Sequence, residues 1–564
     1  MLKKSLFLAF AVVLAAPAAA FDGLAGSYLA ARQASIAGEF QIASNYLERV
    51  VESDPSNIDA MESLILSQIA IGRFDQAIPL ADRIMRAGVQ SQVAHVVQIA
   101  KAVQQQNYKA LVDQLDLQKG IGHSVVDGLL IAWAFVGAGD VQAALAQMKD
   151  LQDQETSLAL INYHMALIYS VVGDFETAET LFQKIEDEPG ALTRRAIIVR
   201  VQSLMMSGAF DQAAAVLAKF FGQNLDPELL QISEEISANK APRKRLIGAV
   251  PDGISEIFHA IAKALNSETQ DDYTLMHARI ATVLSSEHVD AILLTAKILE
   301  NMGQFDLATK TYQKILPDNP IFHLAELGRA EALWDSGNVD AAIEALENLT
   351  RSHHKMVRAY RLLGNYLRYE ERYREAIEVY DDAIKLSDTE NQSTWQLFYS
   401  RGIAYERLDA WPKADRDFRE ALRLNPDQPL VLNYLGYSLV EKKMQLDEAL
   451  IMIEKAVELR PESGFIVDSL GWVLFRMGRY DEAVPHLERA AQLEPIDPII
   501  NDHLGDGYWS VGRKREAHFQ WRRALSFDPE EAEADRIRRK LEVGLDQVLQ
   551  EEGAEPLTVA QTND

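Results

Sequence analysis

Apolar and small residues recur along most of this chain with the period of an α-helix, in pairs of short segments. In residues 395–428 the first segment places such residues at i, i+4 and i+7, and the second segment repeats that spacing. The residues are Phe398, Gly402 and Tyr405, then Ala414, Phe418 and Ala421. Half of them are Gly or Ala, so the pattern predicts two helices that cross closely, with the aromatic rings filling the space around the crossing.

This helix pair is one copy of a unit that recurs along the chain at a nearly constant interval. Six copies share a glycine, an aromatic residue two positions later and an alanine three positions after the aromatic. The glycines are Gly38, Gly72, Gly173, Gly208, Gly303 and Gly478. Glycine is favoured in the left-handed conformation that ends many helices, so each marks a turn between two helices. Weaker copies at positions 106, 139, 268, 337, 371, 409, 443 and 512 bring the predicted total to about fourteen repeats.

One interruption divides the repeats into two blocks. Successive turns are evenly spaced, except for one step of nearly twice the usual length, from position 208 to position 268. Residues 222–253, within that step, contain three prolines and a short basic cluster. We therefore expect an irregular connector or a distorted repeat here, between an N-terminal block over 21–221, of about six repeats, and a C-terminal block over 254–529, of about eight.

The end of the chain departs from the repeat. Residues 530–551 read as one amphipathic helix with a single apolar face, which consists of Ile537, Leu541, Leu545 and Val548. Solenoid proteins need a terminal element that covers the apolar end of the last repeat, and this helix is expected to do so. Residues 552–564 are expected to form a disordered tail.

The repeats resemble the tetratricopeptide repeat (TPR) family. The copy around Gly505 matches the family pattern at Leu504, Gly505, Tyr508, Gly512, Ala517, Trp521, Ala524 and Pro529, and the resemblance covers most of residues 21–529. The resemblance implies an all-α fold, a right-handed superhelical TPR solenoid of helix-turn-helix repeats with a C-terminal capping helix.

The first twenty residues predict that the protein is exported, and they are not expected to be part of the folded domain. Lys3 and Lys4 precede an apolar run from Leu6 to Ala16, and small residues follow at 18–20. This layout is typical of a cleaved secretory signal peptide over 1–20, and the run is too short to span a bilayer. An uncleaved anchor is the alternative. We expect a periplasmic protein with no integral membrane segment after cleavage, and no lipoprotein, because the chain has no cysteine.

The composition of the chain argues against several classes of function. With 56 basic and 83 acidic residues the net charge is −27, which argues against a nucleic-acid partner. No phosphate-binding loop, nucleophile elbow or metal-binding motif occurs, and the absence of cysteine excludes thiol chemistry. We therefore expect a protein that is not an enzyme and that has no cofactor and no metal site.

The candidate site lies on the first helices of the C-terminal repeats. In the TPR family the fifth, ninth and twelfth positions of each first helix face a concave groove that binds proteins or peptides. Those positions, with one residue a turn earlier, give the candidate groove residues Arg358, Arg361, Asn365, Arg368, Tyr399, Asn433, Tyr437, Asp468, Trp472, Asp502, Asp506 and Trp509. Aromatic rings beside amides and charges are typical of peptide-binding grooves. Packing between repeats is the alternative for the aromatic residues, and a solvated helix face is the alternative for the arginines.

Two classes of function follow. The first is an exported scaffold or adaptor that holds protein partners in its groove. The stretches Leu432–Tyr437, Asp468–Trp472 and His503–Asp506 resemble periplasmic TPR adaptors of the LbcA type, which implies a carboxyl-terminal processing protease as partner and cell-wall hydrolases as its presented substrates. The second class is an architectural subunit of an envelope assembly, secretion or polysaccharide-export complex.

Overall fold

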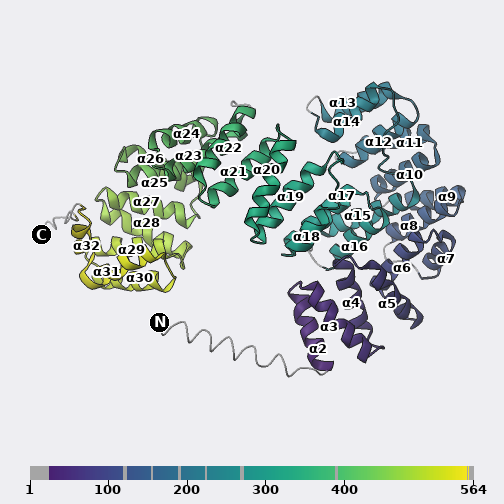
Figure 1. Ribbon diagram of the computed structural model, residues 1–564, viewed down its shortest axis with the longest axis horizontal. Helices are drawn as coiled ribbons and strands as arrows, with labels where there is room; N and C mark the ends of the chain where they lie inside the picture. Colours follow the sequence, from purple (N-terminus) through teal and green to yellow (C-terminus); the bar gives the residue numbers. More distant parts are fainter. Residues whose placement is uncertain are drawn as a thin grey trace. The chain divides into compact units, whose positions relative to one another are not determined.

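The computed structural model describes residues 24–118, 124–153, 157–187, 192–222, 225–266, 268, 272–387, 391–554 and 557. Regular structure in this part of the chain is helical, without a strand (Figure 1). The predicted all-α solenoid is thereby confirmed. The predicted signal peptide and most of the predicted tail fall outside the described residues.

The chain forms two compact units, Met1–Leu349 and Thr350–Asp564. The border falls in the last turn of α20 (Val339–Ser352). The other helices of unit 1 are α2 (Leu24–Ile36), α3 (Phe40–Ser53), α4 (Ile58–Ala70), α5 (Phe74–Arg86), α6 (Gln92–Gln104), α7 (Tyr108–Gln118), α8 (Ser124–Gly137), α9 (Val141–Asp153), α10 (Leu158–Val172), α11 (Phe175–Glu186), α12 (Arg194–Met206), α13 (Phe210–Phe221), α14 (Pro227–Ser237), α15 (Val250–Asn266), α16 (Asp272–Leu284), α17 (Val289–Asn301), α18 (Phe305–Tyr312) and α19 (Phe322–Asp335).

Unit 2 continues the same succession of helix pairs. A 3₁₀ turn, η2 (Gln392–Thr394), precedes its third helix. Its helices are α21 (Val357–Tyr369), α22 (Tyr373–Leu386), α23 (Trp395–Arg407), α24 (Trp411–Leu424), α25 (Pro429–Glu441), α26 (Leu446–Leu459), α27 (Gly464–Arg476), α28 (Tyr480–Leu493), α29 (Pro498–Ser510), α30 (Lys514–Ser526), α31 (Glu531–Val543) and α32 (Leu545–Glu551).

The turns between paired helices have the predicted backbone geometry. The six glycines of the clearest copies all have positive φ, from 70° to 91°. The same conformation occurs at four weaker copies that lack glycine, at Gln106, Glu371, Asp409 and Lys443, with φ from 52° to 58°. The repeat therefore fixes the left-handed turn even where the residue is not the one that adopts it most easily.

Small residues bring the paired helices together as predicted. Ala414 and Ala421 are fully buried, and a Cβ added to Gly402 would lie 2.7 Å from the ring of Phe418 on the second helix. At Gly471 the added Cβ would lie 2.6 Å from Leu487. Closely crossing helices of this kind form the core of each repeat.

The segment over 222–253 is only partly irregular. It contains a helix, α14, whose first turn is capped by Asp226, since the carboxylate of this residue accepts a hydrogen bond from the amide of Leu229 at 3.1 Å. Residues 238–249 then run without a regular helix, and α15 begins at Val250. The border between the compact units does not lie in this segment but far beyond it, at 349/350.

The physical reason is that α15 and α16 fold back onto the first block of repeats. α15 packs against α8 and α10, and α16 packs against α4 and α6, all of which are first helices of their pairs (Figure 1). The Arg279 guanidinium on α16 donates to the carbonyl oxygen of Ala70 at 2.9 Å, across 209 residues of sequence. The face that α4, α6, α8 and α10 would offer to a partner is therefore covered by the chain itself.

The C-terminal cap is also built differently from the prediction. The helix expected over 530–551 is broken at Gly544, where φ is 85° and ψ is 160°, a conformation that is essentially restricted to glycine. The result is two helices, α31 and α32, instead of one. Three of the four predicted apolar residues are buried, namely Ile537, Leu545 and Val548, so the capping role itself is confirmed.

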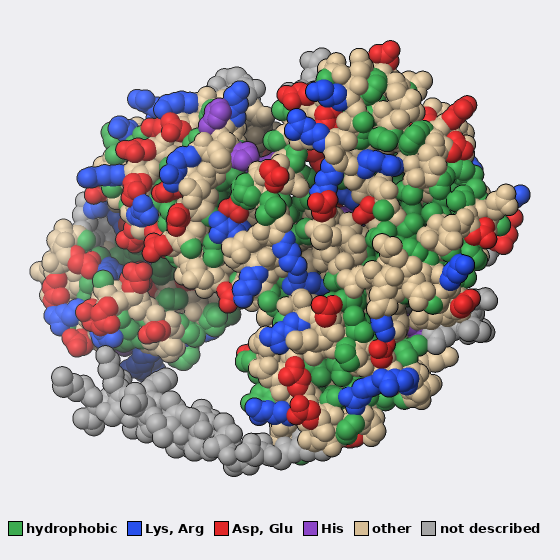
Figure 2. All heavy atoms as spheres, turned by 45° about the vertical axis from the view of Figure 1, so that its right-hand side comes forward, with side chains coloured by type: hydrophobic (Ala, Val, Ile, Leu, Met, Phe, Trp, Pro, Cys, Tyr) green, Lys and Arg blue, Asp and Glu red, His purple; other side chains and the backbone are tan. Residues whose placement is uncertain are grey.

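The surface carries charges of both signs. On the face that Figure 2 shows, acidic and basic side chains are interspersed, which is typical of a solvated protein surface. Among the described residues, none of the helices combines the length and the apolar character needed to cross a membrane.

Candidate functional site

The candidate residues lie on one face of unit 2, which we call the first-helix face. It is formed by α21, α23, α25, α27 and α29, the first helices of five successive pairs. On α21, Arg358 is exposed, whereas Arg361, Asn365 and Arg368 are half-buried. The Tyr380 hydroxyl donates to Asn365 Oδ1 at 2.8 Å, so this amide is held in place by the second helix of its own pair.

Aromatic rings dominate the next part of the first-helix face. The ring of Tyr399 on α23 lies 5.8 Å from that of Tyr434 and 6.1 Å from that of Phe418, centroid to centroid. Such edge-to-face and tilted contacts bind the repeats to one another. Tyr399 is therefore mainly a packing residue. Asn433 on α25 has a buried Oδ1 atom for which the described residues supply no hydrogen-bond partner.

Trp472 on α27 is the centre of a stack. Its ring lies 3.9 Å from the His503 ring and 4.9 Å from the Phe475 ring, both nearly parallel to it. Its indole nitrogen donates to Glu441 Oε1 at 2.8 Å, and only 8% of its surface is exposed. Asp468 is buried as well, and its Oδ2 lies 2.8 Å from His503 Nδ1. The stack and the ion pair join α27 to α29.

On α29 the chain itself contacts the predicted groove residues. Lys540 of α31 is fully buried, and its ammonium nitrogen lies 2.7 Å from both Asp502 Oδ2 and Asp506 Oδ1. The indole nitrogen of Trp509 donates to Asp546 Oδ2 of α32 at 2.8 Å. The polar atoms of these three predicted groove residues therefore hold the C-terminal cap.

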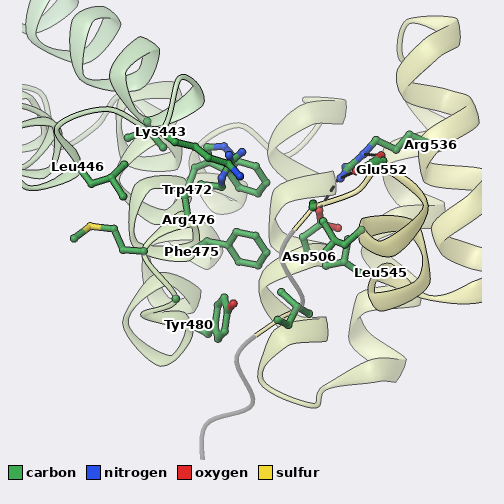
Figure 3. A pocket seen from close by; sticks show the side chains of 16 residues that line it. Lys443, Leu446, Trp472, Phe475, Arg476, Tyr480, Asp506, Arg536, Leu545 and Glu552 are labelled. Carbon is green, nitrogen blue, oxygen red and sulfur yellow. Dashed lines mark hydrogen bonds and ion pairs between the residues drawn. The ribbon is translucent and has the colours of Figure 1, made fainter.

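Two cavities remain between the first-helix face and the cap. One, of about 320 Å³, is lined by Tyr437, Trp472 and Ile499 opposite α31. The other, of about 530 Å³, lies between Trp472, Phe475 and Tyr480 on one side and Leu545 on the other (Figure 3). Trp472 lines both. Aromatic, aliphatic and charged side chains together line these spaces, a combination that suits the binding of a partner's side chains.

Comparison with known families agrees with the geometry. Tetratricopeptide repeat models match residues 28–90, 293–353, 327–391 and 361–429, and a second such model matches residues 468–497. The segments that these models match are tetratricopeptide repeats. TPR proteins are typically non-catalytic scaffolds that bind proteins or peptides.

Curated relatives share only part of the TPR region. The TPR repeat-containing protein PA4667 of Pseudomonas aeruginosa is 26% identical over 185 residues, which are 32% of this chain and 30% of that protein. The BBSome complex member BBS4 of Bos taurus is 33% identical over 113 residues, which are 19% of this chain and 20% of that protein. The human protein O-mannosyl-transferase TMTC1 is 24% identical over 170 residues, 30% of this chain and 19% of that protein. The chain thus spans less than a third of the length of each.

Solved TPR structures are also similar to parts of the chain. The structure of YrrB, described as a TPR protein with an unusual peptide-binding site, covers 35% of this chain and 99% of its own, at 21% identity and a TM-score of 0.28. The Cut9 and Hcn1 assembly of the APC/C covers 93% of this chain and 97% of its own, at 14% identity and a TM-score of 0.38.

Three residues that contact the predicted groove residues were not identified from the sequence. His503, Glu441 and Lys540 each contact a predicted groove residue, at the distances given above. The signal was present for Lys540, because it lies three positions after Ile537 on the predicted capping helix and hence on nearly the same face. A lysine on the apolar face of a cap indicates a buried carboxylate partner, since an unpaired ammonium is costly to bury.

Unit 1 brings three side chains of the kinds that bind metals together, beside the Arg195 guanidinium. Glu256, His259 and His288 place one ligand atom each within 4.8 Å of the others. His288 Nδ1 accepts the amide of Ala291 at 3.1 Å, so the proton of a neutral ring is on Nε2, which lies 3.1 Å from Glu256 Oε1. The guanidinium of Arg195 pairs with the same carboxylate. His288 thus caps α17, and Arg195 neutralises the buried Glu256 carboxylate.

We expect the stability of unit 2 to fall as the pH rises above about 6.5, the ordinary pKa of histidine. Burial alone would lower the pKa of His503, but the Asp468 carboxylate raises it above the ordinary value. Protonated His503 therefore stabilises the folded state below about pH 6.5, and this contribution is lost as the pH passes the higher folded pKa. Urea unfolding at a series of pH values measures the effect. In Asp468→Asn the fall with rising pH should disappear, and an unchanged slope would contradict the assignment.

Proposed function

We propose that this chain is an exported, non-catalytic TPR adaptor that binds a protein partner on the open half of the first-helix face, α21 to α27. The pattern of residues 1–20 supports export to the periplasm. The resemblance of the C-terminal repeats to LbcA-type adaptors supports a carboxyl-terminal processing protease as the partner and cell-wall hydrolases as the proteins presented to it.

The observation that carries the proposal is the difference between the two sets of first helices. The first helices α4, α6, α8 and α10 are covered by α15 and α16, whereas in unit 2 the cap holds α29 and faces parts of α25 and α27 across the two cavities. Arg361 is half-buried on α21, and among the described residues no carboxylate pairs with it. In a chain of net charge −27, a half-buried arginine without a carboxylate partner is suited to an acidic group of a partner.

We expect Arg361→Glu to weaken capture of the partner without unfolding the chain. The charge reversal places a carboxylate where the partner's acidic group would bind, and a lost charge-assisted contact at an interface costs about 2–5 kcal/mol. Capture by the tagged chain from a periplasmic extract, quantified by mass spectrometry for the processing protease and the hydrolases, measures the effect.

Arg374→Glu is the matched control. Arg374 is exposed on α22, a second helix, and its reversal changes the net charge by the same amount. Equal losses in both variants would show that net charge alone drives the association. Recovery that is unaffected by Arg361→Glu would contradict the proposed site.

A further inference from the structure

A leucine beyond the last helix lines the larger of the two cavities in unit 2. Leu557 follows α32, which ends at Glu551, and it lies within the segment that the sequence predicts as a disordered tail. In the structure it is half-buried and packs against the apolar core of unit 2. It lines the cavity of about 530 Å³ together with the rings of Phe475 and Tyr480, which Figure 3 shows. The chain therefore fills part of the space that a partner would enter.

A turn at Gly553 directs the chain from α32 toward this cavity. Gly553 has a φ of 67°, and its amide donates to the carbonyl oxygen of Gln550 at 3.1 Å. The amide of Ala554 donates to the carbonyl oxygen of Leu549 at 2.8 Å. These two bonds define the Schellman motif, in which the residues joined by the longer bond commonly make an apolar contact. Ala554 and Leu549 both line the cavity, so the turn sets the direction in which the chain reaches it.

Leu557 is held less firmly than the helices of the cap. The buried Lys540 ammonium fixes α31, and Arg539 of α31 donates to both carboxylate oxygens of Glu551 in α32, at 3.0 Å and 2.7 Å. Among the described residues, none forms a hydrogen bond or an ion pair with Leu557, so an apolar contact holds it. Half-burying one leucine shifts an equilibrium by only about tenfold. Leu557 can therefore leave the cavity while α31 and α32 stay in place.

We propose that Leu557 is an autoinhibitory plug, which occupies the cavity of about 530 Å³ in the free chain and is displaced when an apolar side chain of the partner enters it. This inference rests on the proposed function and adds a means of regulation to the same face. A partner that binds only the open cavity has an apparent dissociation constant raised by the reciprocal of the open fraction. A plug that favours the closed cavity about tenfold therefore weakens binding about tenfold.

Binding of the anionic dye 1-anilinonaphthalene-8-sulfonate measures the open cavity without any partner. The rings of the dye are apolar, and its sulfonate complements Lys443 and Arg476, which line the cavity. We expect the full chain with Leu557→Ser to bind the dye about tenfold more tightly than the unmodified chain does. Leu316→Ser is the matched control, because Leu316 is a leucine of unit 1 with 62% of its surface exposed. This variant should bind the dye as the unmodified chain does.

A second pair of variants opens or keeps the plug while Leu557 itself is retained. Gly553→Val should also free the cavity, because a β-branched residue is strained at positive φ and the chain would leave α32 in another direction. Gly553→Asn should bind the dye as the unmodified chain does, since asparagine tolerates the left-handed conformation. Among the described residues, and apart from the chain neighbours of Gly553, no atom lies within 4 Å of the added Cβ. The two variants therefore differ in backbone strain rather than in packing.

Capture from a periplasmic extract connects the plug with the partner. We expect Leu557→Ser and Gly553→Val to recover several-fold more of the processing protease and the hydrolases than the unmodified chain does, at equal amounts of tagged protein. Gly553→Asn and Leu316→Ser should recover the same amounts as the unmodified chain.

Three results would overturn the inference. They are dye binding that is equal in Leu557→Ser and the unmodified chain, capture that does not rise in Leu557→Ser, and dye binding that weakens as the protein concentration rises, since a second copy would then supply the leucine. If Arg361→Glu weakens capture while Leu557→Ser changes nothing, the plug fails and the proposed function stands. If Leu557→Ser strengthens dye binding while capture does not depend on Arg361, the proposed function fails and the plug stands as a property of the cavity.

Discussion

Lys540→Met is expected to lower the free energy of unfolding of unit 2 by about 3–5 kcal/mol, because it removes one partner of a buried ion pair. The Lys540 side chain has no exposed surface, and its ammonium lies 2.7–2.9 Å from all four carboxylate oxygens of Asp502 and Asp506. Without it, Asp506, with 1% of its side chain exposed, keeps only the Arg536 guanidinium, 3.7 Å away, as a positive partner. We expect α31 and α32 to detach before the rest of the unit.

Urea unfolding monitored by tryptophan fluorescence measures the effect. The Trp509 indole donates to Asp546 of the cap, and the Trp521 indole donates to Asp506, which pairs with Lys540. The triple variant Lys540→Met, Asp502→Asn, Asp506→Asn is the control, and it should recover most of the loss because no charge is left unpaired. In Lys540→Met alone the deficit should shrink as the pH falls, because burial raises the pKa of Asp502 and protonation of this carboxylate removes an unpaired charge. A deficit that persists in the triple variant would assign the effect to packing instead.

Much of the fold was predictable because a TPR helix pair is a local structure. The turn, the small residues at the helix crossing and the apolar spacing all lie within one repeat, so the sequence of that repeat contains them. Ala483, for example, was predicted from its distance to Gly478 and is fully buried. The cap was predictable for the same reason, except that Gly544 breaks it into two helices.

Contacts between distant repeats were not predictable in this way. A helical pattern shows which face of a helix is apolar, but it does not show which element covers that face. The sequence of α8 is apolar on nearly all sides, which is typical of a helix covered all round, but it does not show that α15 is the element that covers it. The same limit applies to the site. Asp502 and Asp506 pair with Lys540, which lies on α31, 38 and 34 positions further along the chain.

Gly253→Ala is expected to destabilise unit 1 by about 1–3 kcal/mol, although alanine is the better helix former. Gly253 lies in α15 against α8, where a Cβ would come within 2.2 Å of the Trp133 ring. That ring cannot move away easily, because it is fully buried and its indole nitrogen donates to His164 Nδ1 at 3.1 Å. The collision would therefore push α15 away from the first helices that it covers.

Thermal unfolding and limited proteolysis within residues 238–249 measure this release. Gly248→Ala is the matched control, because the nearest atoms to its added Cβ lie 3.8 Å away, which is ordinary contact. If Gly253→Ala melts as the unmodified chain does and resists the protease equally, α15 does not seal the first block. The first helices of unit 1 would then be as available to a partner as those of unit 2. An earlier melting transition in Gly253→Ala alone would show that unit 1 closes on itself, which leaves partner binding to unit 2.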